Sequence, residues 1–143
     1  MRARRVDKPI PLEFQEQIAV IDWWKVFAPT IGQDERILFS VPNGSVLAGD
    51  ARARARQISK LKATGMRPGM LDLMLALPTH CFPGMFIELK RRQGGVTSPE
   101  QVVMVSILRR AGYNVIVARG ADEAIKAIKA YATSGLERRE RVA

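Results

Sequence analysis

Cysteine and histidine are nearly absent from this 143-residue chain, which has one of each, Cys81 and His80. A single cysteine excludes a disulfide within the chain and is typical of a reducing compartment, so we expect a cytoplasmic protein. Transition metals are usually held by three or four cysteine or histidine ligands, so we interpret both residues as turn residues. No apolar run approaches the roughly 18 residues that cross a bilayer, and no membrane partner is expected.

Acidic residues are also in deficit. There are 14 Asp and Glu against 23 Lys and Arg, which leaves a net charge of +9. An excess of this size favours polyanionic partners, of which nucleic acid is the commonest, although a generally basic surface explains it as well. The cations are dense over residues 52–67, where Asp50 is the only acid between Glu35 and Asp72. This segment is a candidate DNA contact, with a solvated helix face as the alternative.

Two acids and a lysine interrupt a pair of apolar segments near the middle of the chain. Residues 72–77 and 85–90 have strand composition and are separated by turn residues. Because side chains alternate along a strand, Glu88 and Lys90 point to the same face. A turn midway between the segments places Asp72 opposite Glu88, with Cβ atoms about 5 Å apart.

The charged groups of this hairpin need a partner, because burying two carboxylates and an ammonium is costly. A divalent cation bound by Asp72 and Glu88 would offset the charge, and Mg²⁺ and Mn²⁺ suit such oxygen ligands. The same cation would activate water and neutralise a phosphate. A structural ion-pair cluster is the alternative, but buried ion pairs are a poor source of stability. The hairpin therefore predicts a metal site for phosphodiester chemistry.

The rest of the chain has the composition of alternating helices and strands. Besides the hairpin, we expect helices over 12–27, 48–63, 98–111 and from Asp122 onward, and strands over 36–41 and 113–118. The order is αβαββαβα, and the strand–helix–strand step from residue 85 to 118 should join parallel strands. The sequence therefore predicts an α/β fold with a mixed central β-sheet flanked by helices.

The helix expected from residue 98 begins with a capping box. Ser98 is suited to the N-cap, Pro99 to the first helical position, and Gln101 to the reciprocal hydrogen bond. Gln101 therefore has a structural role available to it that needs no catalysis.

Five blocks of the chain follow one another in a recognisable order. They are Val41–Gly44, Lys62–Leu73, Phe86–Lys90, Gly95–Gln101 and Ala111–Val115. Together they resemble the VRR-NUC domain of the PD-(D/E)XK nuclease superfamily, in its stand-alone phage or bacterial form. The resemblance implies a restriction-endonuclease-like core over residues 12–132. We expect a disordered basic arm over 1–11 and a loose charged tail over 133–143.

The resemblance also implies roles for the residues of the hairpin. Asp72, Glu88 and the backbone carbonyl of Leu89 would bind Mg²⁺ or Mn²⁺. Lys90 would orient or deprotonate the attacking water and stabilise charge on the phosphate. Gln101 matches a supporting glutamine of the family.

A glutamate on the first helix usually completes such a site. Glu13 fits the family spacing to Gln17 and Trp23 better than Glu16 does, and Glu16 stays the alternative. The expected DNA contacts are all basic residues near the site or on the preceding helix: Arg52, Arg54, Arg56, Lys60, Lys62, Arg67, Arg91 and Arg92.

The activity implied by the resemblance is that of a metal-dependent DNA endonuclease. Small free-standing members of this branch resemble homodimeric enzymes that cut branched DNA such as Holliday junctions, in the cytoplasm of a bacterial or phage-infected cell. Two alternatives stay open: a nuclease acting on flaps or duplex ends, and a non-catalytic DNA-binding module that has kept the nuclease fold.

Overall fold

The computed structural model describes the backbone of residues 9–42 and 47–142, and the side chains of residues 9–42 and 47–135. Its elements are α1 (Glu13–Thr30), a 3₁₀ helix (Glu35–Ile37), β1 (Leu38–Ser40), α2 (Ala51–Ala63), β2 (Leu73–Leu75), β3 (Met85–Lys90), α3 (Pro99–Arg110), β4 (Asn114–Arg119) and α4 (Ala121–Val142). The predicted order of helices and strands is confirmed, with the 3₁₀ helix as an addition.

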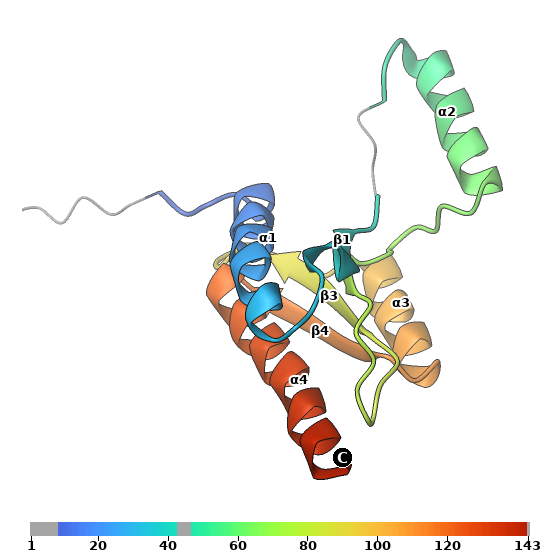
Figure 1. Cartoon of the computed structure of the whole chain (residues 1–143). Helices are drawn as coiled ribbons and strands as arrows, with labels where there is room; N and C mark the ends of the chain where they lie inside the picture. The colour runs from blue at the N-terminus through green and yellow to red at the C-terminus, as the bar shows by residue number, and fades with distance from the viewer. Residues whose placement is uncertain (1–8, 43–46, 143) are drawn as a thin grey trace, which may run out of the picture.

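The four strands form one mixed sheet in the order β1-β2-β3-β4. β1 pairs antiparallel with β2, and β2 pairs antiparallel with β3. β4 pairs parallel with β3, as expected for strands joined through a helix. Helices α1 and α4 lie on one face of the sheet and α3 lies on the other (Figure 1). The predicted α/β fold with a mixed sheet flanked by helices is therefore confirmed.

β3 is buried on both faces, because helices cover both sides of the sheet. Ile87 and Leu89 belong to the core under α1 and α4, whereas Phe86 packs with Val105 of α3. Since side chains alternate, Glu88 and Lys90 share the α3 face with Phe86. The strand thus carries two charged side chains into the layer between the sheet and α3.

Helix α1 buries one narrow stripe. Glu16, Val20, Trp24 and Ala28 are buried and recur every four residues. Other apolar side chains of α1 are exposed, notably those of Phe14 and Ile18. The stripe therefore includes a carboxylate and leaves apolar residues outside, which apolar periodicity alone cannot anticipate.

Helix α2 stands apart from the sheet and the other helices (Figure 1). Asp50 caps it by accepting a hydrogen bond from the Ala53 N–H (2.8 Å). None of its residues is buried. Its position is therefore not fixed by a core of its own.

The two terminal segments can be compared in part with the predicted arm and tail. Residues 133–142 continue α4 as helix, so the loose tail expected there is wrong in conformation. The helix continues because residues 121–142 contain no proline to interrupt it. Of the arm expected over residues 1–11, only residues 9–11 are described, and the Val41–Gly44 block is described only as far as Pro42.

No helix in the described part of the chain is long and apolar enough to span a membrane.

Candidate active site

Asp72 and Glu88 are brought together by the hairpin register. Leu73 lies opposite Ile87, and Leu75 lies opposite Met85. Continuing this register by one residue places Asp72 opposite Glu88, as predicted. The Leu89 N–H donates to Asp72 Oδ2 (2.7 Å) and fixes this carboxylate directly before the first residue of β2. Because the N–H and C=O of one strand residue point to the same edge, the Leu89 carbonyl also faces Asp72.

The two carboxyl groups are largely shielded from solvent. Glu88 is only 1% exposed and Asp72 is half-buried. Burial raises the pKa of Asp72, opposed by the Leu89 N–H and by Lys90. Burial also raises the pKa of Glu88, and the neighbouring Asp72 carboxyl adds to the rise while Lys90 opposes it. Both shifts mean that two negative charges here lack sufficient compensation from the protein itself.

Lys90 and Gln101 bind one oxygen of Glu88. Lys90 Nζ lies 2.7 Å from Glu88 Oε1, and Gln101 Nε2 donates to the same oxygen. Lys90 also donates to Gln101 Oε1 (2.9 Å). The other oxygen, Glu88 Oε2, is buried and has no hydrogen-bond partner. A buried carboxylate oxygen without a donor is expensive unless a cation occupies its free side.

Gln101 serves the helix and the site at once. Its Oε1 accepts from the Ser98 N–H (3.0 Å) and its own N–H donates to Ser98 Oγ (3.2 Å), which completes the predicted capping box. Its amide nitrogen is left to reach Glu88. The capping role and the site contact are therefore simultaneous and not alternatives.

The backbone of Gly69 supports the start of α3. Its φ is +77°, and a Cβ atom there would lie 2.4 Å from the carbonyl carbon of Glu100 and 2.8 Å from the Gln101 nitrogen. Only glycine allows the chain to pass so close to the helix N-terminus. The turn before Asp72 is thereby tied to the residue that contacts Glu88.

The two first-helix glutamates have different surroundings. Glu16 is 2% exposed, accepts from Arg92 Nε (2.7 Å) and from the Ala121 N–H (2.7 Å), and its pKa is lowered chiefly by Arg92. Glu13 is exposed, and its carboxylate contributes to the raised pKa of Asp72. Glu13 is thus the acid of α1 whose charge reaches the hairpin acids, while Glu16 is occupied elsewhere.

A divalent cation fits the groups that the hairpin provides. No three His, Cys, Asp or Glu side chains among the described residues gather into a metal-binding cluster. Mg²⁺, however, commonly uses one or two carboxylates and keeps several of its waters. Asp72 and Glu88, with a free buried oxygen and the Leu89 carbonyl at the same edge, match that requirement.

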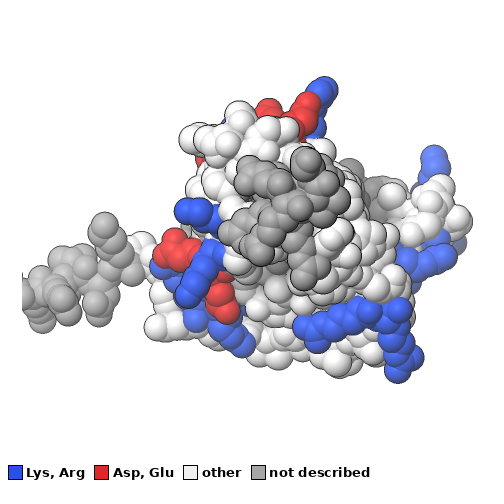
Figure 2. All heavy atoms as spheres, turned by 60° about the horizontal axis from the view of Figure 1, so that its bottom comes forward, with Lys and Arg blue, Asp and Glu red and all other residues white. Residues whose placement is uncertain are grey.

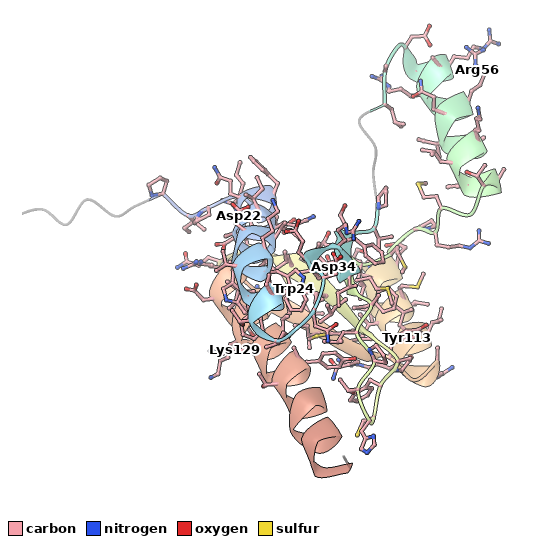
Figure 3. The ribbon with its side chains drawn as sticks, viewed as in Figure 1. Asp22, Trp24, Asp34, Arg56, Tyr113 and Lys129 are labelled. Carbon is pink, nitrogen blue, oxygen red and sulfur yellow. The ribbon has the colours of Figure 1, made fainter. Side chains whose placement is uncertain are left out.

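The cations expected to contact DNA divide into two groups. Five of them are exposed on α2, which stands apart from the sheet: Arg52, Arg54, Arg56, Lys60 and Lys62. Arg67 is exposed in the turn after α2 and lies beside Pro99 and Glu100 at the start of α3. Figure 3 shows Arg56 on this separate helix, in contrast to Trp24, which is buried on α1. Arg91 is exposed directly after Lys90. On the face shown in Figure 2, Lys and Arg side chains lie at several separate places.

Arg92 differs from the other expected DNA contacts. Besides Glu16, it lies 3.6 Å from a carboxylate oxygen of Asp122, and a Cβ at Gly120 would collide with its side chain. The N–H of Ala121, the first residue of α4, donates to Glu16 Oε2 (2.7 Å). The sequence offered no signal for this contact, because Glu16 and Arg92 are 76 residues apart.

Comparison with solved structures shows a likeness of fold. No family model matches the chain, and no curated protein matches it. A solved structure described as "VRR_NUC domain protein" superposes with a TM-score of 0.70 at 22% sequence identity, covering 90% of this chain and 93% of that chain. The recognition made from the five sequence blocks is thus supported by structure, and the chain has the fold of a VRR_NUC domain protein.

Proposed function

We propose that this protein is a metal-dependent nuclease that hydrolyses DNA phosphodiester bonds. The observation that carries the proposal is the buried pair of Asp72 and Glu88, in which Glu88 Oε2 has no hydrogen-bond partner. A fold shared with a VRR_NUC domain protein and a net charge of +9 are consistent with it.

The metal would be held by Asp72, Glu88 and the Leu89 carbonyl. Glu13 is the proposed acid from the first helix, because its charge helps to raise the pKa of Asp72. When bound, Mg²⁺ or Mn²⁺ neutralises phosphate charge and lowers the pKa of a coordinated water. Gln101 holds Glu88 and Lys90 in register through its amide group. Its contribution is to orient the two charged side chains toward the same point.

Lys90 acts as a hydrogen-bond donor to the phosphate in this proposal. Its ammonium lies between Glu88 and Gln101 and is only 5% exposed. An ammonium held 2.7 Å from a carboxylate is a hydrogen-bond donor, and in this proposal it donates to a phosphate oxygen. The positive charge is thus preorganised where negative charge develops on the scissile group.

Branched DNA such as a Holliday junction is the proposed substrate, and a homodimer is the proposed assembly. A two-fold dimer carries two sites related by symmetry, which suits paired nicks on a symmetric junction. Support for this comes from the sequence resemblance and from the exposed cations of α2. Flaps and duplex ends are the competing substrates.

The proposal is tested by incubating the protein with Mg²⁺ or Mn²⁺ and labelled duplex, flap and four-way-junction DNA. We expect cleavage that is lost, by a factor of a thousand or so, in Asp72→Asn and Glu88→Gln. Asp22→Asn is the matched control, because Asp22 is an exposed acid of α1. Titration of Mn²⁺ by calorimetry should show binding that both site variants lose.

The alternative of a non-catalytic DNA-binding module makes the opposite prediction. DNA would then bind with no cleavage of any of the three substrates, and Asp72→Asn would leave Mn²⁺ binding unchanged. Either result would count against the nuclease proposal.

A further inference from the structure

The outer edge of β4 has no strand beside it in the described part of the chain. The sheet ends there, because the strand order is β1-β2-β3-β4. The opposite edge is formed by β1, which has only three residues, whereas β4 has six and contains neither proline nor glycine. Natural proteins shorten or block sheet edges, because free N–H and C=O groups can pair with another chain. β4 is therefore the edge of this sheet that can accept a further strand.

Alternate residues of β4 direct their backbone groups outward. The Asn114 N–H donates to the Gly84 carbonyl (3.1 Å), so the backbone of Asn114 faces β3. Because this direction alternates along a strand, the N–H and C=O groups of Val115, Val117 and Arg119 face away from β3. The open edge thus presents the backbone groups of three residues.

Side chains occupy the two ends of this edge and leave its middle free. Arg109 Nη2 donates to the Val115 carbonyl (3.0 Å) at one end. The Arg119 N–H donates to Glu123 Oε2 (2.7 Å) at the other end. The N–H and C=O of Val117, between them, have no partner on this edge among the described residues. A donor and an acceptor side by side are satisfied together by the backbone of an extended peptide.

A groove between α3 and β4 lies beside the free backbone groups. It has a volume of about 640 Å³, and its lining includes Val102, Val105, Ser106 and Arg109 of α3 and Val117 of β4. The four residues of α3 share one face of the helix, because they are spaced by three, one and three. Val102 is 57% exposed, so the floor of the groove is accessible. Every second side chain of a strand added to β4 would enter this groove.

Charge indicates which kind of segment fits the groove. Arg109 and Arg110 line it where α3 ends, and neither forms an ion pair within the described part of the chain. There is no acid among the described residues that line the groove. An acidic side chain therefore complements this end of the groove. A DNA strand would also pair with the arginines, but its phosphate oxygens only accept hydrogen bonds and would leave the Val117 carbonyl without a donor.

We propose that the outer edge of β4 binds an extended acidic segment of a partner protein as an added strand. The backbone of the segment pairs with the N–H and C=O of Val117. A small apolar side chain of the segment lies over Val102, and an acidic side chain two positions away pairs with Arg109 or Arg110. The interaction goes beyond the proposed nuclease activity and does not depend on it.

Two adjacent valines provide a matched test by fluorescence anisotropy. The probe is a labelled peptide, Glu-Ser-Val-Ser-Glu with blocked ends, whose symmetric sequence offers an acid to the arginines in either strand direction. Val102 lines the groove, whereas Val103, with a nearly equal exposure of 58%, does not. Val102→Asp should raise the dissociation constant roughly tenfold or more, because it places a charge against the apolar side chain, and Val103→Asp should leave it nearly unchanged. A wild-type protein that does not bind the peptide at millimolar concentration overturns the proposal, and so does an equal effect of the two variants.

Two further probes test the charge and the nature of the partner. The peptide Lys-Ser-Val-Ser-Lys should bind much more weakly than the glutamate peptide, and equal binding of the two overturns the assignment of an acidic segment. A single-stranded oligothymidylate is the nucleic-acid probe. If it binds, is weakened by Val102→Asp and is not displaced by the glutamate peptide, the groove is a DNA surface and the proposal is wrong.

Amide hydrogen exchange distinguishes an added strand from a contact through side chains alone. With saturating glutamate peptide, the Val117 N–H should exchange roughly tenfold more slowly, because it becomes hydrogen-bonded. Methylation of alternate peptide nitrogens should abolish binding for one set of positions and leave it for the other, since only one set faces β4. Unchanged exchange at Val117, or equal effects of the two methylated sets, overturns the added strand. These measurements need no DNA cleavage, so their outcome is independent of the nuclease proposal.

Discussion

Glu16 of α1 and Arg92, which follows β3 in the chain, form an ion pair that joins three parts of the fold. Arg92 Nε lies 2.7 Å from Glu16 Oε1, and Glu16 Oε2 accepts from the N–H of Ala121, the first residue of α4. The helix N-terminus favours a negative charge at this position. The carboxylate of α1 therefore fixes the chain segment that leaves the candidate site and the helix that covers the sheet.

Removing this buried carboxylate should destabilise the fold, whereas breaking an exposed ion pair should not. Glu16→Ala leaves Arg92 and the Ala121 N–H without their acceptor and empties a buried position, and we expect a loss of about 3 kcal/mol in the free energy of unfolding. Urea denaturation measures it. Lys25→Ala is the control, because it breaks the exposed pair with Asp22 and should cost almost nothing. Equal midpoints for the two variants would contradict the structural role of Glu16.

The same carboxylate should make stability depend on pH in a defined direction. The pKa of Glu16 is lowered in the folded state, chiefly by Arg92, so folding favours the charged form. Its contribution is complete above the unfolded pKa of about 4.3 and is lost as the pH falls below that value. The stability difference between wild type and Glu16→Gln should therefore shrink from pH 6 toward pH 3. A difference that grows on acidification would contradict this assignment.

The hairpin could be predicted because its information is local. The apolar residues of the two strands and the turn between them fix the register that places Asp72 opposite Glu88. The capping box of α3 was predictable for the same reason, since Ser98 and Gln101 are three residues apart. That Gln101 also reaches Glu88 depends on how α3 crosses the sheet, which no short pattern encodes.

The first helix shows why other features could not be predicted. Helical periodicity identifies α1, but the buried stripe is chosen by the sheet and by α4, which lie far along the chain. Phe14 and Ile18 are therefore exposed although they are apolar. Glu16 is buried because Arg92, which follows β3, forms an ion pair with it. Helix α2 likewise stands apart because none of its residues is buried, and its own sequence does not specify this.

Gly69 should be essential for the geometry of the site and not only for the turn. Gly69→Ala adds a Cβ atom that would lie 2.4 Å from the Glu100 backbone, so α3 must shift and Gln101 must move with it. We expect DNA cleavage to fall at least tenfold and Mn²⁺ affinity to fall as well. Gly65→Ala is a matched control. Gly65 also has positive φ (+111°) but has open space around it, so only backbone strain of about 1 kcal/mol should result.

The two roles of Gln101 can be separated by variants of the capping box. Ser98→Ala removes the cap acceptor and should cost about 1 kcal/mol of stability, with cleavage largely retained. Gln101→Met removes the cap contact and also the hydrogen bonds to Glu88 and Lys90, so cleavage should fall much more than in Ser98→Ala. Steady-state rates at matched stability, checked by thermal unfolding, decide the point. Equal activity of the two variants would show that Gln101 is only a capping residue.

The basic face of α2 should bind DNA without contributing to the stability of the fold. Arg52, Arg56 and Lys60 recur every four residues and form one stripe, and no residue of α2 is buried. Replacing all three by alanine should leave thermal unfolding unchanged and weaken DNA binding. The slope of log affinity against log salt should fall by roughly 0.9 for each lost phosphate contact, so by about 2 to 3 in total. The control replaces three lysines elsewhere, Lys25, Lys126 and Lys129, and removes the same charge. If both triple variants lose affinity and slope equally, the net charge and not the α2 stripe governs binding.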